Sequence, residues 1–263
     1  MTDTYEIYAV RYGHHPRKAA ENFIGGDDHE TDMPLDYFVW AIKGASKTYV
    51  LDTGFDPEVA KRRGRITTLP IAEGLKSIGV EADQVEDVIV SHMHYDHAGN
   101  LGLFPNARFH IQDAEMAYCT GRCMCHPIMR FPFEAQDVEG MVRRVFEGKV
   151  QFHDGDTELA PGITLHKLGG HTKGLQVMRV NTQRGPVVLA SDATHLYANL
   201  ERSHPFPVLA DVGDYLEGLQ TLRRLAPTMS HIIPGHDPKV LTQYPQARPG
   251  LADVVRLDVE PKA

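Results

Sequence analysis

Four of the short apolar runs in this sequence end in a residue that can bind a metal ion. These residues are His92, His171, Asp192 and His236, and each begins a glycine-bearing or polar loop. Apolar runs of this length predict buried strands. If the strands lie side by side in one sheet, their ends and loops meet at a common edge, where a rigid scaffold can present a functional site. The sequence therefore predicts a site assembled from distant segments.

The remaining pattern predicts strands mixed with helices. The clearest helix is expected at residues 214–226, where Leu216, Leu219, Leu222 and Leu225 recur every three residues with charged residues between them. No repeat or linker divides the chain, so we expect a single domain, residues 1–263, with α/β or α+β layers. The predicted strands are residues 47–54, 85–92, 107–112, 163–171, 175–180, 185–192 and 231–236, and the predicted helices are residues 71–79, 134–148 and 214–226.

Charge and composition exclude several classes of function. The net charge of -8 argues against an extended nucleic-acid surface, and the basic run KRRGR at 61–65 is typical of a solvated face. No stretch is apolar and long enough to predict a membrane span, and the N-terminus lacks the pattern of a secretion signal. Three cysteines do not suggest a disulfide framework, so we expect a reducing, cytoplasmic location.

The stretch SHMHYDHAGN, residues 91–100, holds four metal-capable side chains in six residues. A short loop can turn His92 and His94 to one side and Asp96 and His97 to a neighbouring position. Because one ion needs about three or four ligands, this loop supplies half of two sites. The other ligands expected are His171, Asp192 and His236. Five histidines and two aspartates suit two divalent ions that share a carboxylate, with Zn²⁺ expected first and Mn²⁺, Fe²⁺ or Co²⁺ also possible.

The motif HMHYDH resembles the HxHxDH signature of the metallo-β-lactamase superfamily, and the later ligand candidates follow in the order that superfamily uses. The resemblance implies an αββα sandwich with the active site at one edge of its two sheets. It also implies that Asp52, in VLDTG, orients a ligand imidazole. The ligand set that it implies is His92, His94 and His171 for the first metal, Asp96, His97 and His236 for the second, and Asp192 as the bridge between them.

Among subfamilies, the chain is most similar to the quorum-quenching N-acyl homoserine lactone lactonases. The similarity rests on SHMHYDHAGN, LGGHTKG, VVLASDAT, HIIPGHD and the total length. Those lactonases usually carry a tyrosine three residues after the bridging aspartate, to assist the substrate carbonyl or the leaving group. Here His195 stands at that position, and Tyr197 follows two residues later. Either residue, or neither, takes that role; a histidine could act as a hydrogen-bond donor or general acid.

The leading hypothesis is a dinuclear lactonase in which a metal-bridging hydroxide attacks a lactone carbonyl and Asp96 shuttles the proton. The substrate expected is a small lactone or ester, with acyl homoserine lactones first. A second hypothesis is a thioesterase resembling glyoxalase II, but residues 251–263 carry only Arg256 and Lys262 to recognise glutathione. A different ester hydrolase, a phosphodiesterase or a metal-binding protein without turnover would also be compatible with these ligands.

Three further segments allow two interpretations each. Cys119, Cys123, Cys125 and His126 could hold another zinc or be reduced, packed thiols with a neighbouring histidine. Met129, Phe131 and Phe133 could line a pocket for an acyl chain or belong to the core. The polar segment 13–26 is hard to place on a strand and could be a loop over the site or a homodimer contact. Within it, His14 and His15 are expected to be solvated rather than ligands.

Overall fold

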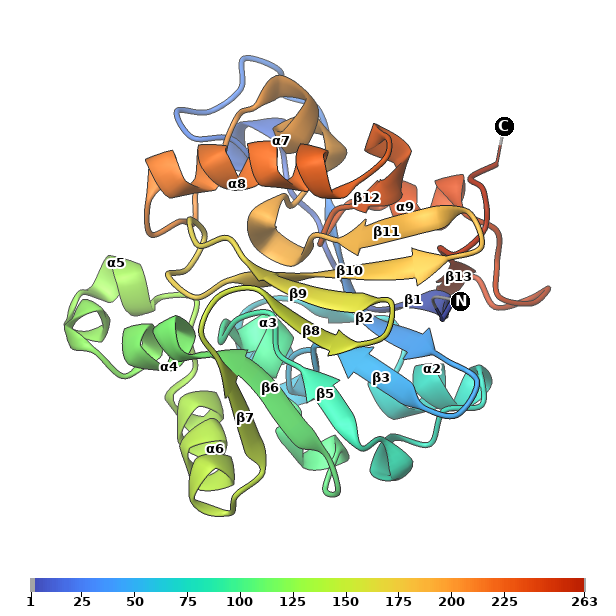
Figure 1. Ribbon diagram of the computed structural model, residues 1–263. Coiled ribbons are helices and arrows are strands. Elements are labelled where there is room, and N and C mark those ends of the chain that lie inside the picture. The colour runs from blue at the N-terminus through green and yellow to red at the C-terminus, as the bar shows by residue number, and fades with distance from the viewer. Residues whose placement is uncertain (1–2, 263) are drawn as a thin grey trace.

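The computed structural model describes residues 3–262, which form two sheets packed face to face with helices on both outer faces (Figure 1). The first sheet is eight-stranded, in the order β13-β1-β2-β3-β5-β6-β7, and β4 pairs with β1. The second sheet is five-stranded, in the order β12-β11-β10-β9-β8. The predicted αββα sandwich is therefore confirmed. Within the described residues, no helix is long and apolar enough to cross a membrane.

The bounds of the elements are as follows. The first sheet contains β1 (Glu6–His15), β2 (Leu35–Lys43), β3 (Thr48–Leu51), β4 (Ile66–Thr67), β5 (Asp87–Ile89), β6 (Arg108–Gln112), β7 (Val150–His153) and β13 (Val254–Arg256). The second contains β8 (Thr157–Ala160), β9 (Ile163–Lys167), β10 (Gln176–Thr182), β11 (Gly185–Leu189) and β12 (Ile232–Ile233). The α-helices are α1 (Pro57–Arg62), α2 (Ile71–Ser77), α3 (Tyr95–Ala98), α4 (Asp113–Cys119), α5 (Pro127–Arg130), α6 (Ala135–Phe146), α7 (Tyr197–Arg202), α8 (Val212–Leu225) and α9 (Lys239–Gln243). The 3-10 turns are η1 (Ala19–Glu21), η2 (Ala82–Gln84), η3 (Leu101–Leu103), η4 (Arg122–Cys125), η5 (Ser191–Ala193) and η6 (Met229–His231).

Alternation along the long strands builds the layers. In β1, Ile7 and Ala9 pack into the core between the two sheets, whereas Tyr8 and Val10 pack into the core beneath the helices of the first sheet. This two-faced burial follows from the period of two in a strand. The sequence pattern did not predict β1 or β2. It also suggested that Gly13 to His15 lie in a loop, whereas β1 extends to His15. Both strands are buried on both faces and lack a simple alternation of polar and apolar residues.

The leucine repeat in α8 is only partly buried. Leu219 and Leu222 pack against the second sheet, while Leu225 is half-buried and Leu216 is exposed. A spacing of three residues turns about 60° short of a full helical turn at each step, so four such leucines spread over half of the helix surface. The middle two therefore face the sheet. Figure 1 shows α8 lying across the outer face of β10 and β11.

The four strands that lead to metal-capable residues lie in two sheets, not in one as the sequence pattern suggested. His92 follows β5 of the first sheet, and the other three residues follow β9, β11 and β12 of the second. β9 and β11 are both antiparallel to β10, and β12 is parallel to β11, so the carboxyl ends of these three strands share one edge. The site therefore forms where this edge meets the loop after β5.

Candidate metal centre

All seven predicted metal ligands come together at this edge, and His195 joins them. The ligand atoms of each of three overlapping groups lie within 4.8 Å of one another, and every member is buried. The groups are His92, His94, His171 and Asp192; Asp96, His97 and His236; and Asp192, His195 and His236. Loops from both sheets thus place six imidazoles around two carboxylates.

Asp192 lies between two sets of imidazoles and faces each set with a different carboxylate oxygen. Its Oδ2 is 3.0 Å from His171 Nε2 and 3.8 Å from His92 Nε2. Its Oδ1 is 2.9 Å from His236 Nε2 and 3.3 Å from His97 Nε2. The carboxylate is therefore oriented as a link between two neighbouring sets of nitrogen atoms.

The second nitrogen of four imidazoles is held by a hydrogen-bonding group behind it. These contacts fix the orientation of each ring and leave its Nε2 directed into the cluster. They pair His92 Nδ1 with Ser91 Oγ at 3.0 Å, His97 Nδ1 with Asp52 Oδ2 at 2.8 Å, His171 Nδ1 with the carbonyl of Val208 at 2.7 Å and His236 Nδ1 with the carbonyl of Asp36 at 3.0 Å.

Asp52 and Ser191 are held in unusual backbone conformations next to the cluster. Asp52 has a φ of 66° and Ser191 a φ of 44°, in a backbone region that residues other than glycine seldom adopt. Asp52 accepts hydrogen bonds from the backbone N–H and hydroxyl of Ser91, besides its contact with His97. Ser191 donates to the hydroxyl of Ser91 at 2.9 Å. Such strain persists where the surroundings over-determine a conformation, as at a functional site.

Burial and neighbouring charge shift the pKa values of the cluster in opposite directions. Burial, followed by the neighbouring imidazoles, lowers the pKa of His92 and His94 well below the ordinary value, so both present neutral nitrogens. Burial also acts to lower the pKa of His97, but Asp192, Asp52 and Asp96 outweigh it and raise this pKa well above the ordinary value. The cluster therefore combines neutral imidazoles at His92 and His94 with carboxylates that favour positive charge at His97.

These residues fit a divalent metal ion. The Nε2 atoms of His92 and His97 are buried and make no hydrogen bond within the described chain, so they are available as ligands. Leaving such polar atoms buried and unsatisfied is costly. Neutral imidazoles combined with carboxylates are the donor set that Zn²⁺, Mn²⁺, Fe²⁺ or Co²⁺ prefers.

Glu115, which the sequence pattern did not single out, ties two ligand loops together. Its side chain is fully buried in α4 and accepts a hydrogen bond from the N–H of Met93, between His92 and His94, at 2.9 Å. Its other oxygen accepts from the Thr172 hydroxyl at 2.6 Å and the Gly174 N–H at 3.1 Å. Residue 174 must be a glycine, since a Cβ there would lie 2.1 Å from the Glu115 backbone nitrogen. An acidic residue three positions after the end of strand β6 is the signal available in the sequence.

His195, rather than Tyr197, lies at the cluster. His195 Nε2 is 3.0 Å from Asp192 Oδ2, and burial lowers the pKa of His195 to about 3. The Tyr197 ring packs in the core between the sheets and lines neither of the clefts described below. Asp96 lines the cleft beside the cluster, with Oδ2 3.7 Å from His97 Nε2.

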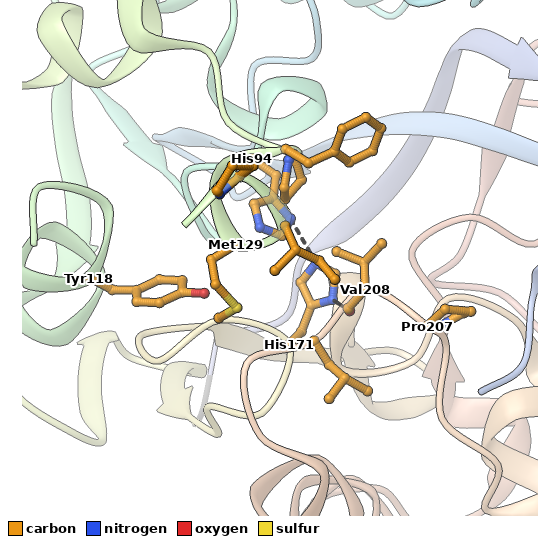
Figure 2. A pocket seen from close by; sticks show the side chains of 11 residues that line it. His94, Tyr118, Met129, His171, Pro207 and Val208 are labelled. Carbon is orange, nitrogen blue, oxygen red and sulfur yellow. Dashed lines mark hydrogen bonds between the residues drawn. The ribbon is translucent and has the colours of Figure 1, made fainter. Parts of the chain in front are cut away.

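An apolar cleft of about 480 Å³ opens from His94 and His171. Figure 2 shows these two imidazoles facing each other, with Met129 and Tyr118 on one side and Val208 on the other. Met129 and Phe131 line this cleft, but Phe133 does not. Phe133 is buried and packs edge-on against His94, with ring centroids 4.6 Å apart.

A smaller cleft of about 70 Å³ lies directly over the cluster. Its wall includes Arg17 and Arg65, which the sequence pattern did not mark as functional. The run 61–65 is therefore not a uniformly solvated face: Lys61 and Arg62 are exposed, but Arg63 and Arg65 are half-buried. The three-dimensional path of the loop after α1 places Arg65 in the wall of this cleft.

The cysteine segment and the early histidines form no metal-binding group in residues 3–262. Cys119 is buried, and burial raises the pKa of its thiol to about 12, whereas Cys125 is exposed. His14 is half-buried and contacts Asp36 Oδ1 at 2.7 Å, so it is not simply solvated as expected. His15 is half-buried beside Arg65.

Three comparisons with known proteins agree with this geometry. Residues 33–236 match the family model of the Metallo-beta-lactamase superfamily. An N-acyl homoserine lactonase of Bacillus sp is 32% identical over 135 residues, which is 50% of this chain and 48% of that protein, so this match spans about half of the relative's length. The N-acyl homoserine lactonase AiiB of Agrobacterium fabrum is 26% identical over 224 residues, 78% of this chain and 80% of that protein.

Solved structures share the fold over nearly the whole chain. A quorum-quenching N-acyl homoserine lactone lactonase superposes with a TM-score of 0.74 at 24% identity, covering 91% of this chain and 94% of that one. AidC, a dizinc quorum-quenching lactonase, superposes with a TM-score of 0.71 at 18% identity, covering 90% and 89% of the two chains.

Proposed function

Because this chain belongs to the metallo-β-lactamase superfamily, we propose that it is a dinuclear metal-dependent hydrolase that opens lactone rings. The observation that carries the proposal is the position of Asp192. Its two oxygens face two different sets of imidazole nitrogens, 3.0 Å from His171 and 2.9 Å from His236. A carboxylate shared in this way supports two ions held side by side, the arrangement used in hydrolytic two-metal sites.

The residues that would hold the ions are the seven ligands predicted from the sequence. His92, His94 and His171 would hold one ion, and Asp96, His97 and His236 the other, with Asp192 shared. When bound, two such ions supply hydroxide at neutral pH and polarise a carbonyl oxygen.

The chain's own residues would position the substrate and move the proton. Asp96 lines the small cleft and can accept a proton beside the reacting carbonyl. His195 is neutral at pH 7, because its pKa is lowered to about 3, so it can donate a hydrogen bond but not act as an imidazolium acid. The apolar cleft beside His94 can exclude water from the acyl part of the substrate.

Acyl homoserine lactones are the first candidate substrates, because the relatives with that activity align over up to 78% of this chain. A different lactone or ester is the second candidate. It is favoured by His195, which stands where those lactonases usually carry a tyrosine.

The test is hydrolysis of a panel by Zn-, Mn- and Co-loaded protein, with metal content measured in parallel. The panel contains acyl homoserine lactones of several chain lengths and simple γ- and δ-lactones, with S-lactoylglutathione and bis-p-nitrophenyl phosphate as controls. We expect lactone turnover that EDTA abolishes, and about two ions per chain falling in Asp192→Ala. Lactone hydrolysis that persists at full rate after metal removal, or turnover of the phosphodiester alone, would overturn the proposal.

A further inference from the structure

Arg17 and Arg65 line the small cleft over the cluster, and neither forms an ion pair. Within residues 3–262, no carboxylate oxygen lies within 4.0 Å of either guanidinium, whereas the neighbouring Arg63 is paired with Glu134 at 2.8 Å. Both side chains are only half-exposed. Partly buried guanidinium groups are normally paired with an anion, so two unpaired ones in one cleft require an explanation.

Arg17 is held by stacking rather than by a counter-ion. Its guanidinium lies 5.1 Å from the ring centroid of Phe206, and it donates to the backbone carbonyl of Glu21. Its Nε is buried and has no hydrogen-bond partner in the described chain. The Glu21 carboxylate instead accepts the N–H of Lys18 at 2.7 Å. Arg17 therefore retains donors for another group.

Arg65 is held by hydrogen bonds to its Nε and Nη1 atoms. Its Nε donates to the Tyr95 hydroxyl at 2.8 Å, and its Nη1 donates to the carbonyl of Arg63 at 2.7 Å. Nη1 is also 3.1 Å from His15 Nε2. Nη2 makes no hydrogen bond within residues 3–262, and the other bonds fix the plane of the guanidinium at the cleft wall. A guanidinium fixed in this way is pre-organised for an oxyanion.

The carboxylates near the two arginines stay beyond ion-pair distance: Glu21 attracts Arg17 electrostatically without pairing with it. Burial, then Arg65 and Arg17, lower the pKa of His15 to about 4, so the His15 imidazole is uncharged at neutral pH. Asp96 attracts Arg65 electrostatically, but it belongs to the ligand cluster. The wall formed by Arg17 and Arg65 thus carries two cations with no carboxylate at ion-pair distance among residues 3–262.

We propose that Arg17 and Arg65 bind an anionic group of the substrate, so that the preferred substrate is a lactone or ester bearing a carboxylate near the scissile bond. The small cleft has room for a group of that size, while the apolar cleft, which shares His94 and His171 with it, takes the uncharged part. This assignment rests on the proposed hydrolase function and departs from a neutral acyl homoserine lactone.

The first test compares two matched lactones with the metal-loaded protein: γ-butyrolactone carrying a γ-carboxylate, and the neutral γ-carboxamide of the same ring. We expect the wild type to favour the carboxylate by about 10–100-fold in kcat/KM, and Arg17→Gln/Arg65→Gln to reduce this preference to about twofold or less. Arg108→Gln is the matched control, since Arg108 is exposed, at the start of β6 and outside both clefts. Equal loss on both lactones in the double variant would overturn the assignment.

The second test needs no turnover. Calorimetry should show that glutarate binds the metal-loaded protein about tenfold more tightly than butyrate, with the difference lost in Arg17→Gln/Arg65→Gln and partly kept in Arg17→Lys/Arg65→Lys. The lysine pair also serves if the glutamine pair fails to fold. If neither these lactones nor the panel of lactones above reacts but the glutarate preference is present, the hydrolase proposal fails and the anion site stands. If both lactones react equally well and glutarate binds no better than butyrate, the anion site is wrong and the hydrolase proposal stands.

Discussion

The imidazole of His195 lies flat against the ring of Phe206, with centroids 3.7 Å apart and planes inclined by 9°. This stacking directs His195 Nε2 toward Asp192, 3.0 Å away, and leaves Nδ1 buried without a partner in the described chain. The ring is therefore held against the cluster by an apolar surface rather than by a second hydrogen bond.

His195→Phe should keep the stacking and remove the polar nitrogen. We expect kcat for lactone hydrolysis to fall about 10–100-fold, as for loss of one positioned donor, with little change in thermal unfolding. Tyr197→Phe should stay within about twofold of the wild type, because the Tyr197 ring packs in the core and lines neither cleft. Steady-state kinetics of both variants checks this; a large loss in Tyr197→Phe alone would show that the tyrosine, not His195, assists the reaction.

Glu115→Ala should weaken metal binding without touching a ligand. The change leaves the N–H groups of Met93 and Gly174 and the hydroxyl of Thr172 unpaired in the interior, so the two ligand loops lose their common anchor. We expect about 10–100-fold weaker zinc binding in competition with a chromophoric chelator, as for other groups that support metal ligands. The matched control is Glu139→Ala, which removes an exposed carboxylate paired with Arg143 on α6. Unchanged zinc affinity in Glu115→Ala would rule out the anchoring role.

Asp137→Asn should remove a pH-dependent loss of stability. Burial, then Glu134 and Asp56, raise the pKa of Asp137 to about 7 in the folded chain. Since the unfolded carboxyl titrates near 4, the folded state holds the extra proton between about pH 4 and 7, and stability falls as pH rises through that window. The asparagine variant should match the wild type near pH 4 and exceed it by about 1–2 kcal/mol at pH 8, a value reduced for partial solvent screening.

Urea denaturation of the Asp137 variant at pH 4, 6 and 8 measures this difference. Glu139→Gln, an exposed change on the same helix, should show no such trend. A stability difference that is constant across the three pH values would mean that the pKa of Asp137 is the same in the folded and the unfolded chain.

Phe131→Ala should reduce the preference for long acyl chains. Phe131 is 62% exposed yet lines both clefts, so the substitution can remove apolar contact surface with little cost to folding. We expect kcat/KM for a decanoyl substrate to fall about 5–10-fold relative to a butyryl substrate, from the lost apolar burial. Phe146→Ala, 88% exposed on α6 and outside both clefts, is the control. An unchanged ratio of the two substrates in Phe131→Ala would assign the acyl chain to another surface.

The sequence alone determined the chemistry of the cluster. Ligand identity is a local property, so four metal-capable side chains within residues 92–97 and three more after apolar runs could be recognised without a structure. The layered fold could also be predicted, because apolar runs and leucine spacing report burial directly. Helix α6 and strands β6 and β10 lie close to their predicted bounds for this reason.

The tertiary structure decided what surrounds the cluster. Sheet membership depends on pairing between distant strands, so β5 and β9 could not be assigned to different sheets from local pattern. Glu115, Arg17 and Arg65 have no local signature of function, since an acidic residue after a strand or a basic residue in a loop is usually solvated. Their roles depend on which remote loops they meet. The candidate ligands could therefore be recognised in the sequence, whereas the groups that contact their loops and those proposed to select the substrate follow from long-range packing.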